Sequence, residues 1–90
     1  MAELDYDNAI NISENFIPNK NGYVYARFLA KDASGSSVGA TQNGIPLAGN
    51  QVTGYSFLHL NFIVRKNIEV KFSMVNCGFN GTYSRFIPFK

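Results

Sequence analysis

The side chains most able to do chemistry in this 90-residue chain are its single histidine, His59, and its single cysteine, Cys77. Nucleophilic catalysis needs a nucleophile, a base within hydrogen-bond reach and a third group that orients the base. His59 stands between Leu58 and Leu60 in an alternating segment, which is typical of a structural histidine in a strand. Cys77 ends a predicted strand, where a small buried thiol is more common than a reactive one. Neither residue has an evident activating partner.

Acidic side chains gather near the N-terminus, where Glu3, Asp5 and Asp7 alternate along the chain. On an extended segment they would share one face and could hold a hard cation, although mutually repelling, solvated carboxylates are the simpler interpretation. His59 and Cys77 show no Cys-x-x-Cys or His-x-x-x-His spacing. The sequence also lacks a Gly-rich phosphate loop and a Gly-x-Ser-x-Gly elbow. It therefore predicts a non-enzymatic protein with no catalytic residue, no metal site and no cofactor.

Charge divides the chain at residue 14. Residues 1–14 hold four carboxylates and no basic residue, a charge of −4, whereas residues 15–90 hold all eight Lys and Arg against two carboxylates, a charge of +6. Apolar side chains are interspersed with the acidic ones, which is more than a purely solvated tail requires. We therefore expect an acidic arm at residues 1–14 before a domain at residues 15–90. The arm is either a frayed, solvated terminus or a segment that docks on a basic partner surface. The expected anchoring residues of this arm are Leu4, Asp5, Tyr6 and Asp7.

The length of the chain favours oligomerisation. A domain of this size buries only about 60–65% of its unfolded surface and is marginally stable as a monomer. One cysteine cannot form a disulfide within the chain, so association with other copies is the expected source of additional stability. A composition that is 46% hydrophobic argues against disorder, but no stretch approaches the roughly 20 apolar residues of a membrane span. The acidic N-terminus does not resemble a signal peptide, so we expect assembly in a cytoplasm and no membrane insertion.

Hydrophobic residues recur with period two nearly everywhere, which predicts strands. In residues 23–30 the apolar face carries Val24 and Phe28, and in residues 57–64 it carries Leu60 and Phe62. The complete set of predicted strands is 23–30, 57–64, 68–74 and 84–89, with shorter ones at 9–12, 38–41 and 45–47.

Turn residues separate these strands. Three Asn-Gly pairs, the dipeptide favoured in type I′ turns, are predicted to be turns: Asn21-Gly22, Asn43-Gly44 and Asn80-Gly81. Residues 32–37 form an expected polar loop and residues 65–67 an expected basic turn. No window shows a helical apolar stripe beside a cap. About seven short strands with this spacing predict an all-β fold, a small antiparallel sandwich or barrel.

Several predicted strands carry apolar side chains on both faces, whereas an outer strand of a monomer normally has one polar face. We therefore predict that the second faces are buried against another subunit. A closed sandwich with a few exposed aromatic residues is the alternative. The predicted interface residues are Tyr23, Tyr25, Phe57 and Ile63.

Residues 16–90 resemble the small C-terminal β-modules of phage and prophage tail fibres and of related virion fibre or decoration proteins. Four short motifs carry the likeness: Phe16-Ile17-Pro18-Asn19-Lys20-Asn21-Gly22-Tyr23, Asn43-Gly44-Ile45, the strand-turn-strand of residues 62–70, and Arg85-Phe86-Ile87-Pro88-Phe89-Lys90. The chain departs from the pattern at Val64, where Pro is common, and at Asn67, where Gly is usual. It also begins only fifteen residues before the likeness, which favours a free-standing fibre head over the tip of a long fibre.

This resemblance implies a bacteriophage virion structural protein, a capsid-surface or tail fibre head located in the virion and made in the host cytoplasm. The implied architecture is a jelly-roll-like sandwich that forms a homotrimer about a threefold axis. Its implied partners are its own copies, other virion proteins through the N-terminal arm, and host-surface glycans. Deleting residues 2–8 is then expected to leave the trimer intact but prevent its incorporation into particles. The expected receptor-facing loop residues are Tyr55, Phe79, Asn80, Tyr83 and Arg85.

Two other binding functions stay open. Tyr23, Tyr25 and Phe28 in a basic chain would suit an OB-like barrel that stacks single-stranded nucleic acid. Against this interpretation, Phe28 lies on the strand face opposite the two tyrosines, and the basic residues are scattered. A carbohydrate-binding module, whose aromatic side chains stack on sugars, is the other alternative.

Overall fold

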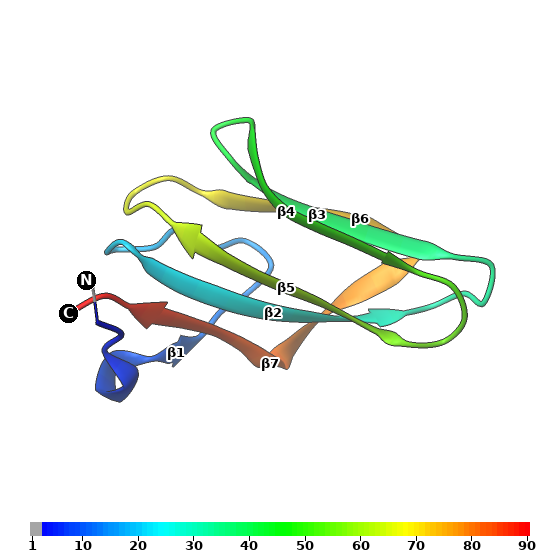
Figure 1. Cartoon of the computed structure of the whole chain (residues 1–90), viewed down its shortest axis with the longest axis horizontal. Helices are drawn as coiled ribbons and strands as arrows, with labels where there is room; N and C mark the ends of the chain where they lie inside the picture. The colour runs from blue at the N-terminus through cyan, green and yellow to red at the C-terminus, as the bar shows by residue number, and fades with distance from the viewer. Residues whose placement is uncertain (1–2) are drawn as a thin grey trace.

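Two antiparallel β-sheets face each other across one hydrophobic core in the computed structural model, which describes residues 3–90 (Figure 1). The all-β class predicted from the sequence is confirmed, since the only helical element among residues 3–90 is the short 3-10 helix η1 (Tyr6–Asn8). No helix in this described range is long and apolar enough to span a bilayer. The strands are β1 (Ile10–Asn11), β2 (Gly22–Ala30), β3 (Ser36–Gln42), β4 (Ile45–Val52), β5 (Phe57–Val64), β6 (Val70–Val75) and β7 (Cys77–Pro88).

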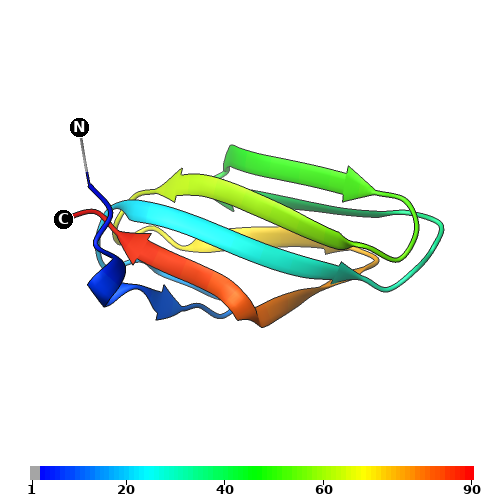
Figure 2. The same ribbon diagram turned by 60° about the horizontal axis from the view of Figure 1, so that its bottom comes forward.

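The order of the strands interleaves distant parts of the chain. One sheet has the order β1-β7-β2-β5 and the other the order β4-β3-β6, and all neighbouring strands are antiparallel. After β2, every connection except the β3–β4 hairpin crosses from one sheet to the other (Figures 1 and 2). Phe16 adds an isolated antiparallel bridge to Val70 on the open side of β6. In the larger sheet, the C-terminal strand β7 lies between β1 and β2.

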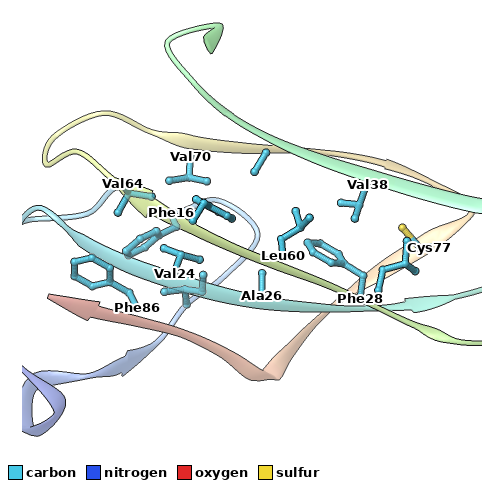
Figure 3. Close-up of a cluster of buried hydrophobic side chains, with 14 of the residues drawn as sticks. Phe16, Val24, Ala26, Phe28, Val38, Leu60, Val64, Val70, Cys77 and Phe86 are labelled. Carbon is cyan, nitrogen blue, oxygen red and sulfur yellow. The ribbon is translucent and has the colours of Figure 1, made fainter. Parts of the chain in front are cut away.

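Alternate residues of the long strands fill the space between the sheets (Figure 3). The apolar faces predicted for β2 and β5 are confirmed, because Val24, Phe28 and Leu58 are fully buried. Aromatic rings join the two sheets, with the Phe28 and Phe72 ring centroids 5.3 Å apart. Burying one such side chain stabilises the folded state by about 1.5–3 kcal/mol. The burial of alternate residues along the facing strands therefore holds the two sheets together.

The hairpin predicted at Asn43-Gly44 is confirmed. Both residues have positive φ, 53° and 78°, as a two-residue type I′ connection requires. The basic turn at residues 65–67 is also present, and Asn67 adopts φ 65° there. Asparagine tolerates this left-handed conformation, which otherwise favours glycine.

The turns predicted at Asn21-Gly22 and Asn80-Gly81 are wrong. Gly22 is the first residue of β2 and pairs with both Val64 and Pro88. Asn80 and Gly81 lie inside β7, where the pairing with β2 shifts between Tyr25 and Arg27. The backbone N–H of Arg27 donates to Ser84 Oγ at 3.0 Å, and this hydroxyl donates to the carbonyl of Asn80 at 2.8 Å. The chain forms a bulge here and not the expected turn. The backbone polar groups at the bulge are satisfied by hydrogen bonds within the sheet.

The acidic N-terminal segment is part of the fold within the described range, and residue 14 does not mark a structural boundary. The backbone N–H of Asp5 donates to Pro88 O at 2.8 Å, and that of Lys90 donates to Glu3 O at 2.8 Å. Strand β1 pairs with β7, and Ile12 belongs to the core with an exposed fraction of 6%. Of the expected anchoring residues, Leu4 and Asp5 are partly buried, whereas Tyr6 and Asp7 are exposed. The first two residues of the expected arm lie outside the described range.

Candidate functional site: the outer face of the larger sheet

His59 and Cys77 lie on opposite faces of the four-stranded sheet. His59 is exposed, and its Nδ1 is 2.7 Å from the hydroxyl of Tyr25. Cys77 is buried beside Ala30, and its Sγ is 3.4 Å from the carbonyl oxygen of Ser37. Burial raises the pKa of the Cys77 thiol above its ordinary value. The fold therefore does not bring this thiol and this imidazole together as a nucleophile and its base.

The alternating carboxylates near the N-terminus do not converge. Glu3 Oε2 lies 3.6 Å from the ammonium group of Lys90, and Asp5 Oδ2 accepts a hydrogen bond of 2.6 Å from Asn8 Nδ2. No group of three His, Cys, Asp or Glu side chains suited to a metal ion occurs among residues 3–90.

The outward-pointing side chains of the four-stranded sheet form one continuous surface, which we call the outer sheet face (Figure 2 shows the ribbon from this side). All four predicted interface residues lie on it. Tyr23 pairs directly with Ile63 near one end of the β2–β5 ladder, and Phe57 pairs with Leu29 at the other end. Ile63 and Phe57 remain 64% and 43% exposed. The face consists of Asn11 of β1, Tyr23, Tyr25, Arg27 and Leu29 of β2, Phe57, His59, Asn61 and Ile63 of β5, and Gly78, Asn80, Tyr83, Arg85 and Ile87 of β7.

Polar groups hold the rings of this face in place. The Tyr23 hydroxyl donates to Asn61 Oδ1 at 2.6 Å, and the hydroxyl of Tyr25 bonds to His59 as described above. Both bonds run diagonally from β2 to β5, because Tyr23 is paired with Ile63 and Tyr25 with Asn61. The tyrosine rings are thus fixed across the strands, and such fixed rings lose little entropy when a partner covers them.

Arg27 occupies the centre of the face between two aromatic rings. Its Cζ is 4.6 Å from the centroid of Phe57 and 4.4 Å from that of Tyr83, distances typical of cation–π contacts. Its Nε is buried without a hydrogen-bond partner. The only ion pairs among residues 3–90 are Lys71–Glu69 and Lys90–Glu3, so the charges of Arg27 and Arg85 are not compensated within the described chain.

The outer face of the three-stranded sheet is different. Its outward positions hold small or polar side chains, and Val75, 56% exposed, is the only large apolar side chain exposed on that face within the described chain. Such a face is normal for a sheet in contact with water. Its other residues are Ser37, Gly39 and Thr41 of β3, Pro46, Gly49 and Gln51 of β4, and Lys71 and Ser73 of β6.

The five expected receptor-facing residues do not form a loop cluster, and this expectation is corrected. Only Tyr55, 74% exposed, lies in a loop, because β7 extends through the other four. Phe79 points inward, with its ring 5.6 Å from those of Phe28 and Phe72. Asn80 lies at the bulge, and Tyr83 and Arg85 belong to the outer sheet face.

The central position of Arg27 was missed from the sequence. Alternation places its side chain outward, but only the bulge in β7 brings Tyr83 onto its guanidinium group. No short motif marks this arrangement, since its residues come from three strands.

Comparison with known proteins adds no relative: no protein family, curated protein or solved structure matches this chain.

Proposed function

We propose that this chain is a bacteriophage virion structural protein, a non-enzymatic fibre head that works as a homotrimer. The observation that carries the proposal is the contrast between the two outer faces. The outer face of the three-stranded sheet carries small and polar side chains. The outer sheet face instead holds fixed aromatic rings and the exposed apolar side chains of Phe57 and Ile63. Exposed aromatic and apolar side chains that share one sheet face of a small domain mark an interaction site. We assign the outer sheet face to contacts between subunits.

The connectivity of the strands supports this proposal by analogy. In a jelly roll, two four-stranded sheets exchange strands through two Greek keys. The order β1-β7-β2-β5 against β4-β3-β6 follows that pattern if the Phe16–Val70 bridge is what remains of an eighth strand beside β6. Viral capsid domains and lectins use this architecture, which fits a virion component but is a fold-level argument.

In this proposal the N-terminal segment contacts other virion proteins, and exposed aromatic residues such as Tyr55 contact host-surface glycans. The helix η1 contains no buried residue, so deleting residues 2–8 removes little of the core. The truncated protein should remain folded yet be missing from purified particles. Particles that carry the truncated protein at normal copy number would argue against this role of the segment.

The test of self-association compares two matched substitutions. Ile63→Lys alters the outer sheet face, and Val75→Lys alters the opposite face at an equally exposed β-branched residue. Light scattering coupled to size exclusion should report three chains of 10.0 kDa, about 30 kDa, for the unmodified protein and for Val75→Lys. Ile63→Lys should elute as a folded monomer, because a buried unpaired charge costs several kcal/mol. An unmodified protein that stays monomeric at all concentrations would overturn the proposal.

Carbohydrate binding is the second candidate, because the outer sheet face combines rings with hydrogen-bonding groups, as sugar sites do. A monomeric protein whose tyrosine fluorescence responds to a glycan, and no longer responds after Tyr25→Ala, would favour this function. The OB-like alternative is corrected by the fold, since that fold is a five-stranded barrel and these residues form two separate sheets.

A further inference from the structure

The charge of the outer sheet face restricts how three copies can be arranged; this inference rests on the proposed homotrimer. In a threefold ring, either identical faces meet at the axis or one surface of each copy meets a different surface of the next. The face carries Arg27 and Arg85 and no carboxylate. Three such faces at one axis would bring like charges together, which costs several kcal/mol when they are desolvated. The complementary surface must therefore lie elsewhere on the neighbouring copy and be acidic.

Most carboxylates among the described residues lie in one segment of the chain. Glu69 lies 4.0 Å from Lys71, and Asp32 accepts the backbone N–H of Ser34 within its own loop. The remaining four carboxylates all lie in residues 3–14. This segment also exposes two apolar side chains, Tyr6 at 69% and Ile10 at 50%. We call residues 3–10 the acidic edge.

The position of the acidic edge suits contact with another copy. It runs beside β7, at the border of the sheet opposite to β5 (Figure 2). The edge thus leaves its own outer sheet face open. Glu3 is exposed but pairs with Lys90, whereas Asp7, which is in no ion pair among residues 3–90, and the exposed apolar side chains are available to a neighbour.

We propose that the acidic edge of each protomer docks on the outer sheet face of the next one, so that three heterologous contacts close the ring. The Asp7 carboxylate meets the guanidinium groups of Arg27 and Arg85, and Tyr6 and Ile10 pack on the aromatic rings. The Arg27 guanidinium group lies against the rings of Phe57 and Tyr83. Its N–H groups donate in the guanidinium plane, the geometry that a carboxylate accepts in a bidentate pair. The partner of this face is therefore a second copy of this chain.

A charge swap tests the contact. Arg85→Glu and Asp7→Lys change exposed side chains, so each variant should fold, as its circular dichroism melting curve will show. Each should weaken trimer formation by about tenfold or more in sedimentation equilibrium, because like charges then face each other. The double variant restores opposite charges and should return to within about threefold of the unmodified protein. Lys71→Glu, with the same charge change on the other sheet, should associate normally.

The outcomes separate this inference from the proposed function. If the unmodified protein is a trimer but the double variant associates no better than the single ones, the docking arrangement is wrong and the homotrimer stands. Deleting residues 2–8 gives a second readout, because the docking arrangement requires a folded monomer in place of the trimer that the sequence alone led us to expect. A truncated chain that still forms trimers would also overturn the docking arrangement. A monomeric unmodified protein would instead remove the homotrimer itself.

Discussion

At the scale of single residues, Gly22 is a position where the backbones of neighbouring strands leave no room for a side chain. A Cβ built there would lie 2.5 Å from the carbonyl oxygen of Ile87 and 2.6 Å from Phe86 Cε1. Gly22→Ala should therefore lower the free energy of unfolding by about 1–3 kcal/mol or more, measured by urea denaturation. Gly39→Ala is the control, because its Cβ would meet nothing closer than 3.7 Å. Equal losses in the two variants would contradict this account of Gly22.

Cys77 should make stability depend on pH above neutrality. Its pKa is raised in the folded state because the thiolate is poorly solvated there. The folded protein therefore keeps a proton that the unfolded chain releases, and stability falls as pH rises through the unfolded pKa, about 8.5. Urea denaturation of the unmodified protein and of Cys77→Ala at about pH 7 and pH 10 isolates this effect, since other groups titrate alike in both. The stability difference between the two proteins should fall with pH; a constant difference would contradict the prediction.

At the scale of elements, the burial of one side chain, that of Ile12, adds to the backbone pairing that attaches the N-terminal segment to the sandwich. Ile12 is 6% exposed and belongs to the core, whereas Ile10 in β1 is 50% exposed. Ile12→Ala should cost about 2–4 kcal/mol of unfolding free energy, because it leaves a cavity in the core. Ile10→Ala should cost less than about 1 kcal/mol. If chemical denaturation shows equally small losses of unfolding free energy for the two variants, the segment is not an integral part of the sheet.

The three Asn-Gly pairs show how elements override local preference. The same dipeptide forms a hairpin turn at Asn43-Gly44, begins a strand at Gly22 and lies inside the bulged β7 at Asn80-Gly81. A type I′ turn needs two flanking strands that pair with each other, as β3 and β4 do. The segments around the other two pairs find different strand partners, so their backbone groups are satisfied without a turn.

At the scale of the whole molecule, a homotrimer predicts stability that depends on protein concentration. Association adds stability to the folded state by mass action, so a more concentrated sample should melt at a higher temperature. Calorimetry at two protein concentrations about 100-fold apart should show this shift for the unmodified protein and no shift for the monomeric Ile63→Lys variant. An unmodified protein with one melting temperature at both concentrations would contradict the trimer.

Local pattern in the sequence determined the all-β class, the residues that face the core, and the shared outward face of Tyr23, Tyr25, Phe57 and Ile63. Period two decides which side of a strand each residue occupies, and this needs no knowledge of the neighbouring strands. The tertiary structure alone decided that β7 runs between β1 and β2, that Phe79 points inward, and that Tyr83 covers Arg27. These features depend on which distant strands pair and where a bulge shifts their register. Such pairing minimises the free energy of the whole sandwich, and no short segment encodes it.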